Sequence, residues 1–368
     1  MSFFYNSTPS NNANVLYTEK EPRCYIILLN YNGWKDTLEC LESLFKQDYP
    51  NYKIIVIDNH STDNSVDKII DWAEGKIEAS KSIDMLSHLT SPAVPKPIKY
   101  KLLTTQKLND KIDNKSCIDE NLSLLLIANH ENRGFSAGNN VGLKFISSRN
   151  EESYIWLINN DTVVESNALS ELVKCANNYT SKKEKVGLIG AKLRYYHKPN
   201  TIQGIGGKFN YWLATSTHIG VCKIDANQYD DSRYVEKIDY PIGASLFFSK
   251  AYIEDVGLMC EDYFLYFEEI DWVLRGKKKG WGIGYCWNAI VFHKEGGSIG
   301  SHQQADKKSI LSDYCALKGR ITFMKKFYPF RSWIVKLSFI LVVFNRLRRC
   351  QFERIGMIIR LVFNIKHS

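Results

Sequence analysis

The sequence predicts an α/β fold with a mostly parallel sheet covered by helices. The apolar runs CYIILLN (24–30) and YKIIVID (52–58) have the composition of strands that are buried on both faces. The first is followed by apolar residues at helical spacing, namely Leu38, Leu41 and Leu44, and the second by SVDKIIDWAE. This alternation of strand and helix needs crossover connections, which give a parallel sheet with covered faces.

The rest of the chain continues the pattern with one interruption. Residues 75–121 hold several prolines and many polar residues, and we expect an irregular surface insertion there. After it we expect strands at 122–128, 154–158 and 185–196, helices from 139 and from 166, and a strand that ends at His293. We therefore predict a disordered polar tail over 1–22, one α/β domain over 23–308, and a helical tail over 309–368.

Positive charge is concentrated at the C-terminus. The chain has 48 Lys and Arg against 40 Asp and Glu, a net charge of +8. Twelve of the basic residues but one acid, Glu353, lie from Lys318 onward. An anionic partner is expected there, either lipid or nucleic acid. No nucleic-acid recognition motif accompanies the basic residues, so we expect no nucleic-acid partner.

The compartment predicted from the sequence is the cytoplasm. The nine cysteines form no CxxC pair and no cluster with histidine, which is typical of reduced thiols. The N-terminus lacks an apolar signal core, and no run of 18 apolar residues exists. The C-terminal tail interleaves aromatic, aliphatic and basic residues. Either its helices pack on the α/β domain, or they lie on an anionic membrane surface.

Polar residues end three of the predicted strands. They are Asn30-Tyr31-Asn32, Asp58-Asn59 and Asn159-Asn160-Asp161. One such end is explained by a turn, because Asn and Asp favour turns. Three that point to the same rim of a parallel sheet predict a ligand site, since ligands of open α/β sheets bind outside the carboxyl ends of the strands.

Three further motifs carry candidate chemistry. The loop NRGFSAGNN (132–140) separates a strand from a helix, and its glycines permit close backbone approach to an anion, although an ordinary turn explains it equally well. The segment YFEEIDWVLR places Glu268, Glu269 and Asp271 among aromatic residues, which suits a general base. A solvated helix face with an ion pair to Arg275 is the alternative. His293 ends an apolar strand and gains a role if that end faces Asp161.

The segment GGSIG (296–300) competes with this interpretation. It matches the nucleophile-elbow pattern G-x-S-x-G and favours a serine hydrolase that uses Ser298. Lys294 and Glu295 separate it from the preceding strand, so the strand–turn–helix that this motif requires is not clear.

In combination these motifs resemble glycosyltransferase family 2 proteins with a GT-A fold, and more narrowly the bacterial rhamnosyltransferase-like branch that builds surface polysaccharides such as O-antigen. The resemblance runs from about Cys24 to about Pro329. It rests on IILLNYNG, IIVIDNHSTDNS, NRGFSAGNN, WLINNDT, GASLFFSKAYIEDVG, FLYFEEIDWVLRGKKKGW and HKEGGS, in that order. It implies a GT-A, Rossmann-like domain over 23–308.

The resemblance also implies an activity. This would be an inverting, metal-dependent transfer of a hexose from a nucleoside-diphosphate sugar, dTDP-rhamnose or a UDP sugar, to a glycan or polyprenyl-linked acceptor. Such an enzyme would be cytoplasmic and peripheral on the inner face of the cell membrane.

The resemblance assigns roles to individual residues. Those that contact the nucleotide or the diphosphate would be Asn30, Tyr31, Asp58, Asn132, Gly134, Gly138, Asn139 and Asn160. Asp161 would hold Mg²⁺ or Mn²⁺, with His293 as a further ligand of the metal or the diphosphate, and Glu269 would be the base that deprotonates the acceptor.

Two departures from the family pattern leave alternatives open. Asn159 stands where many relatives have an aspartate, so the chain could instead be a non-catalytic sugar-nucleotide binder. Glu269 replaces the more usual aspartate, so the base could instead be Glu268 or Asp271.

Overall fold

The computed structural model describes residues 21–113, 121–295 and 309–363. Residues 1–20 of the predicted tail over 1–22, and the Ser298 motif, lie outside these residues. The helices and strands of the α/β domain, in chain order, are β1 (Arg23–Asn30), α1 (Trp34–Leu44), β2 (Tyr52–Asp58), α2 (Ser65–Ala73), η1 (Asp84–Leu86), α3 (Ser87–Thr90), β3 (Tyr100–Thr104), α4 (Thr105–Asp113), β4 (Leu124–Ala128), α5 (Phe135–Ser147), β5 (Ser153–Asn159), β6 (Thr162–Val164), α6 (Ala168–Ser181), β7 (Val186–Tyr195), β8 (Lys198–Gly204), β9 (Gly207–Asn210), β10 (Thr215–His218), η2 (Ser232–Lys237), β11 (Ser245–Ser249), α7 (Lys250–Val256), α8 (Glu268–Lys278) and β12 (Gly282–His293). A helical extension follows with α9 (Ile310–Phe327), η3 (Pro329–Arg331), α10 (Ser332–Arg348) and α11 (Phe352–Phe363).

One large mixed sheet organises the α/β domain, which confirms the predicted fold class. Its order is β3-β4-β2-β1-β5-β11-β7-β12-β6, and β8 pairs with β7. Strands β3, β4, β2, β1 and β5 are parallel, and β11 runs antiparallel to both β5 and β7. Because β12 is parallel to β7, its carboxyl end lies on the same rim as those of β1, β2 and β5.

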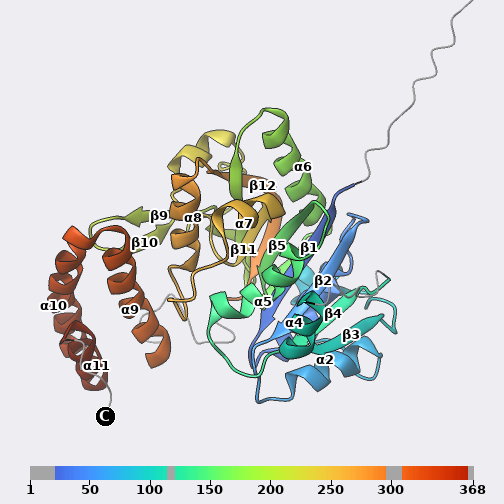
Figure 1. Cartoon of the computed structure of the whole chain (residues 1–368), viewed down its shortest axis with the longest axis horizontal. Coiled ribbons are helices and arrows are strands. Elements are labelled where there is room, and N and C mark those ends of the chain that lie inside the picture. The colour runs from blue at the N-terminus through green and yellow to red at the C-terminus, as the bar shows by residue number, and fades with distance from the viewer. Residues whose placement is uncertain (1–20, 114–120, 296–308, 364–368) are drawn as a thin grey trace, which may run out of the picture.

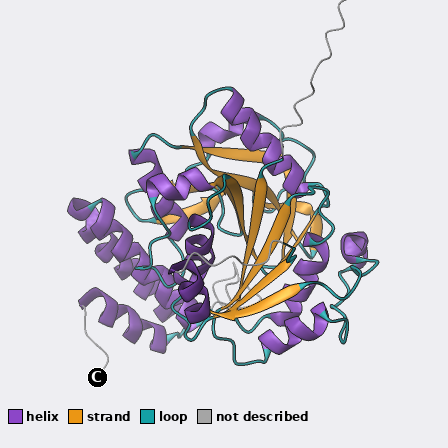
Figure 2. Ribbon diagram, turned by 45° about the vertical axis from the view of Figure 1, so that its right-hand side comes forward, coloured by secondary structure: helices purple, strands orange, loops and turns teal. Residues whose placement is uncertain are grey.

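Helices cover both faces of this sheet (Figures 1 and 2). Alternate residues of each strand supply two separate cores: Ile27 and Ile57 face one side, while Ile26 and Val56 face the other. One core is closed by α5, α7, α8 and α9, and the other by α1, α2 and α6. The two-sided burial explains why these strands are apolar along their length.

The expectation of an irregular insertion over 75–121 is wrong for much of that segment. It supplies β3, which forms the edge of the main sheet beside β4, and also η1, α3 and α4. The prolines and polar residues were misleading because an edge strand tolerates polar side chains, as at half-buried Lys101 and exposed Thr104.

Three helices follow the α/β domain and stand together at one end of the molecule (Figure 1). Their presence confirms the prediction of a helical C-terminal segment. Among the described residues, no helix is both long and apolar enough to cross a membrane.

Candidate active site

The pairing of β6 with β12 brings Asp161 and His293 together. Asp161 lies between β5 and β6, and β6 runs antiparallel to β12 so that Thr162 pairs with His293. Lys294 N also donates to the Asp161 carbonyl oxygen at 2.9 Å. As a result Asp161 Oδ1 lies 3.1 Å from His293 Nε2, and both side chains are largely buried. The strand end that holds His293 therefore faces Asp161.

Gln203 fixes the orientation of the His293 ring through the nitrogen that does not face Asp161. His293 Nδ1 lies 2.9 Å from Gln203 Oε1, on β8. An amide oxygen accepts, so Nδ1 carries a proton, and Nε2 is the nitrogen that faces the Asp161 carboxylate. Burial of the ring lowers the pKa of His293, but the neighbouring Asp161 charge raises it, and the net direction is upward. Two electron-rich atoms that face each other require a proton or a cation between them.

A divalent cation fits this pair chemically. A carboxylate oxygen and an imidazole nitrogen are both accepted by Mn²⁺, and Mg²⁺ prefers the oxygen. No group of three or more His, Cys, Asp or Glu side chains gathers around a metal position in the described part of the chain. The described part of the chain thus offers two neighbouring candidate ligands here, Asp161 and His293.

A buried network of amides and hydroxyls connects the ends of β1, β2 and β5. Asn30 Nδ2 donates to Asp58 Oδ1 at 2.7 Å, and Thr37 Oγ1 donates to Asn30 Oδ1 at 2.8 Å. Asn160 Nδ2 donates to Thr37 Oγ1 at 3.0 Å, and the Ser61 backbone N–H donates to Asp58 Oδ2 at 3.0 Å. The structure thus brings the three predicted polar strand ends into one network. Half-buried Tyr31 follows Asn30 at the same rim.

The glycine loop is fixed against the segment that precedes α8. Asn132 Oδ1 accepts from Asn59 Nδ2 at 2.8 Å and from the Gly134 N–H at 2.9 Å. Gly134 has φ +94°, and a Cβ at this position would lie 2.4 Å from the Phe264 carbonyl oxygen. The Phe135 N–H donates to that same oxygen at 2.8 Å. Glycine is required here both by the backbone angle and by the close approach.

Gly138 and Asn139, which were predicted to contact the nucleotide, have other partners in the structure. A Cβ at Gly138 would lie 2.4 Å from Leu29 Cδ1, so this glycine lets α5 pack closely on β1. Asn139 is buried, and its Nδ2 donates to the Phe135 carbonyl oxygen at 3.0 Å. These contacts give both residues a structural role, and their contact with a nucleotide stays a prediction.

Glu268 and Glu269 begin α8 and differ in their surroundings. Glu268 is buried, and its Oε2 has no hydrogen-bond partner in the structure. Burial and the neighbouring Glu269 charge raise the pKa of Glu268 well above its ordinary value. Burial raises the pKa of half-buried Glu269 to about 7. Glu269 therefore ionises first and has the properties of a general base near neutral pH.

The carboxyl group of Glu269 lies on the same rim as Asp161. A Cβ built at Gly243 would lie 3.7 Å from Glu269 Cδ, so the carboxyl group rests over this glycine. The next residue, Ala244, accepts a hydrogen bond from Asn159 N at 3.1 Å. Asn159 is two residues before Asp161, and β11 pairs with β5 immediately beyond this point.

Asp271 lies in an ion-pair cluster, which argues against it among the three candidates for the base. Its side chain is fully buried, and its Oδ1 accepts from Arg275 Nε at 2.7 Å. Its Oδ2 lies 2.6 Å from Lys326 Nζ, on α9, and accepts from Tyr263 Oη at 3.1 Å. A fully buried carboxylate held by two cations and a phenol has a structural role. The alternative of an ion pair to Arg275 is correct for this residue, but the pair is buried.

Two residues with left-handed backbone conformations precede α8 and set the direction in which it begins. Tyr266 has φ +69° and Phe267 has φ +74°, which is strained for residues other than glycine. Packing on α9 holds them: Tyr266 Oη lies 2.6 Å from Ser312 Oγ, and a Cβ at Gly319 would lie 2.6 Å from the Phe267 ring. Sequence reasoning missed this turn and also Gln203, because neither forms a motif and their partners are distant in the chain.

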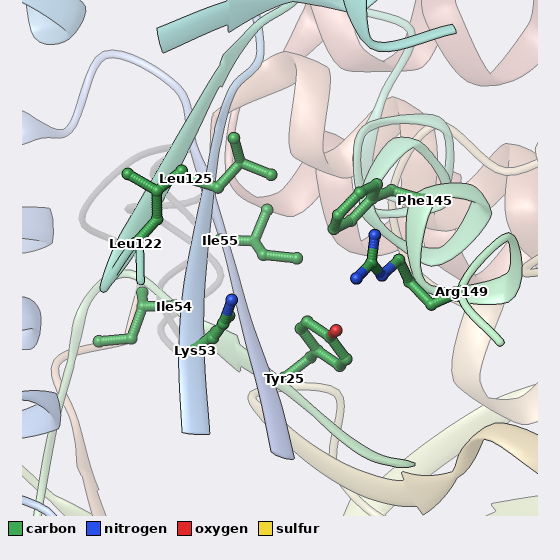
Figure 3. A pocket seen from close by; sticks show the side chains of 8 residues that line it. All are labelled: Tyr25, Lys53, Ile54, Ile55, Leu122, Leu125, Phe145 and Arg149. Carbon is green, nitrogen blue, oxygen red and sulfur yellow. The ribbon is translucent and has the colours of Figure 1, made fainter. Parts of the chain in front are cut away.

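A small hollow near the opposite rim of the sheet, at the amino ends of β1 and β2, is not part of this site. It is lined by Tyr25, Lys53, Leu122, Phe145 and Arg149, among others (Figure 3). Tyr25 and Lys53 lie near the amino ends of β1 and β2, away from the rim that holds Asn30 and Asp58.

Comparison with known proteins adds a family match for the N-terminal part of the sheet. A model of the family described as glycosyl transferase family 2 matches residues 25–83, which run from β1 to just before η1. The match makes residues 25–83 similar to this family, and we call them the family 2 segment. This family 2 segment contains Asn30, Tyr31 and Asp58, and its match agrees with the resemblance in IILLNYNG and IIVIDNHSTDNS. The rhamnosyltransferase-like branch is not shown.

One curated relative and two solved structures are similar to this chain. The chain is 22% identical over 167 residues to the low-salt glycan biosynthesis hexosyltransferase Agl10 of Haloferax volcanii, a match that covers 45% of this chain and spans about half the length of that protein. The structure is similar to that of GalNAc-T7 with UDP, GalNAc and Mn²⁺, with a TM-score of 0.52 and 12% identity over 84% of this chain and 48% of the other. A Pyrobaculum calidifontis mannosyltransferase in complex with GDP-Man and Mn²⁺ has a TM-score of 0.49 and 13% identity over 95% of this chain and 77% of the other. The fold is of the GT-A type.

Proposed function

We propose that this chain is an inverting glycosyltransferase that moves a sugar from a nucleoside-diphosphate sugar to a glycan acceptor. The observation that carries the proposal is the gathering of the Asp161–His293 pair and the Glu269 carboxyl group on one rim of the sheet. The family 2 segment at residues 25–83 supports it, as does the hexosyltransferase relative. We take residues 23–308 as the catalytic domain and 309–368 as its extension.

In this proposal the leaving group departs beside Asp161. A divalent cation, Mg²⁺ or Mn²⁺, would be held by Asp161 and His293, and when bound it would offset the charge that develops on the diphosphate. The similar GalNAc-T7 structure carries Mn²⁺ with UDP. Gln203 keeps the His293 ring turned toward Asp161. The network of Asn30, Asp58 and Asn160 would line the nucleotide pocket, and the glycine loop at Asn132 and Gly134 would border it.

Glu269 would remove the proton from the acceptor hydroxyl as that oxygen attacks. A base with a pKa of about 7 is largely ionised slightly above neutral pH and retains enough basicity to accept the proton. A single displacement with the base opposite the leaving group inverts the configuration at the sugar carbon. Glu268, kept protonated by burial, would leave Glu269 as the carboxylate that titrates in the working pH range.

The substrates are assigned by resemblance. dTDP-rhamnose is the first candidate donor, and UDP sugars follow. The acceptor would be a growing surface glycan on a polyprenyl lipid, which would place the enzyme on the cytoplasmic face of the cell membrane. The hexosyltransferase relative is named for glycan biosynthesis.

The proposal is tested with a panel of nucleotide sugars, each incubated with the protein and with Mg²⁺ or Mn²⁺. Mass spectrometry then measures the nucleoside diphosphate that is released. We expect metal-dependent release from at least one donor, and its loss in Asp161→Ala. A serine hydrolase would instead lose its activity in Ser298→Ala and tolerate Asp161→Ala. Donor binding without any release across an acceptor panel would indicate a non-catalytic sugar-nucleotide binder.

A further inference from the structure

Helix α10 has two faces of opposite environment. Val335, Phe339 and Arg346 are buried toward α9. The other side exposes six large apolar side chains, between 48% and 68% exposed each, which we call the docking face: Trp333, Leu337, Ile340, Leu341, Phe344 and Leu347. Their spacing of three and four residues places them on one continuous stripe. Exposed apolar surfaces of this size are rare on soluble monomeric proteins and mark interaction sites.

The neighbouring elements extend the apolar surface. On α11, Phe352, Ile359 and Phe363 are exposed at spacings of seven and four residues, and a Cβ at Gly356 between them would meet no atom within 4 Å. Before α10, Phe330 is 93% exposed. Trp212, in the turn between β9 and β10, is also exposed and lies 4.0 Å below the Arg331 guanidinium.

The charges that accompany this surface are almost all positive. Arg348, Arg349 and Arg360 are exposed beside the apolar residues, and Glu353 is the single acid in the described residues of α10 and α11. The acid that α9 directs toward these helices, Asp313, is buried and accepts from Arg346 and Arg354 at 2.9 Å. This cluster fixes both helices to α9 and neutralises the acid internally, which leaves the exposed surface cationic.

We propose that the docking face inserts into the interface of an anionic membrane, with α10 lying in the plane of the bilayer. Amphipathic helices with apolar side chains between cations bind in this way, and bury their apolar face by about 5–10 Å at the headgroup boundary. The guanidinium groups of Arg348 and Arg360 would meet lipid phosphates. A second copy of the chain fits less well, because a two-fold contact through this face would bring its cations together.

Sedimentation with lipid vesicles tests this surface. The full chain is mixed with vesicles of phosphatidylcholine alone or of phosphatidylcholine with phosphatidylglycerol. We expect co-sedimentation with the anionic vesicles, weakened by salt. Changing Trp333, Leu337, Ile340 and Phe344 to Ser should lower binding by about tenfold or more, since each removes buried apolar area at the interface. Arg348→Glu with Arg360→Glu should abolish the preference for anionic lipid.

The matched control is a variant with Ser at Met85, Leu102 and Ile224, which are exposed apolar residues outside α10 and α11; it should bind like the wild type. Unchanged circular dichroism in each variant shows that the fold persists. The proposal is overturned if the wild-type chain stays in solution with anionic vesicles, or if the four-serine variant still binds. A concentration-dependent dimer that these serines dissolve would assign the face to a second copy instead. Asp161→Ala should bind vesicles like the wild type. Membrane binding and transferase activity are therefore tested independently of each other.

Discussion

At the scale of single residues, the carboxylate of Asp161 and the ring of His293 form the centre of the candidate site, with Oδ1 and Nε2 3.1 Å apart. From the sequence, His293 gains a role only if its strand end faces Asp161, and the structure meets that condition. The acids 268, 269 and 271 could not be ranked, because the ranking depends on burial and on partners such as Lys326, 55 positions after Asp271 (326 − 271). Gln203 carried no signal because its role depends on β8, which pairs beside β7.

The two glutamates that begin α8 make separable predictions. In Glu269→Gln, sugar transfer should fall by about 10²-fold or more while the donor still binds, since the change removes a general base. The wild-type kcat/KM should rise with pH through about 7, because the base must lose its proton. Glu268→Gln should keep most of the activity and the same acidic limb, because an amide resembles the protonated carboxyl group. A profile that loses this limb in Glu268→Gln would reverse the assignment.

Gly134 makes a prediction about stability. Gly134→Ala should lower the free energy of unfolding by about 2 kcal/mol or more, because the new Cβ meets the Phe264 carbonyl oxygen and the backbone has positive φ. Gly280→Ala is the matched control: it shares the positive φ but meets no atom within 4 Å, so it should lose only about 1–2 kcal/mol. Urea denaturation measures both. Equal losses would show that the contact with Phe264 contributes nothing.

At the scale of elements, α9 connects the base to the C-terminal helices. It contacts Tyr266 and Phe267 through Ser312 and Gly319, and Lys326 at its end pairs with Asp271 of α8. The same helix holds α10 and α11 through Asp313. The orientation of Glu269 therefore depends on a helix outside the sheet, which no local pattern in the sequence indicated.

Asp271→Ala tests this connection between α8 and α9. It removes a fully buried carboxylate that accepts from Tyr263 and half-buried Arg275 and pairs with exposed Lys326, so the free energy of unfolding should fall by about 1–3 kcal/mol. Thermal or urea denaturation measures the loss. Glu269→Gln serves as the control and should unfold like the wild type. If Asp271→Ala keeps full stability yet loses turnover, Asp271 acts in catalysis and the structural role given to it here is wrong.

At the scale of the whole molecule, most of the sheet could be predicted because its strands are buried on both faces and therefore apolar throughout. Two parts could not. β3 lies at the edge, where polar residues are tolerated, and residues 198–218 form short strands, β8 to β10, whose alternation is broken by glycines. The helical extension was predicted from its composition, but the separation of its buried and exposed faces required the coordinates.

The central claim is that Asp161, with His293, holds a divalent cation against the donor diphosphate on the rim that also carries Glu269. Isothermal titration of the nucleotide-sugar donor, with and without Mn²⁺, tests it most directly when applied to the wild type, Glu269→Gln and Asp161→Ala. We predict that Mn²⁺ tightens donor binding by the same factor in the wild type and in Glu269→Gln, and that this factor disappears in Asp161→Ala. Undiminished Mn²⁺-dependent binding in Asp161→Ala would contradict the account.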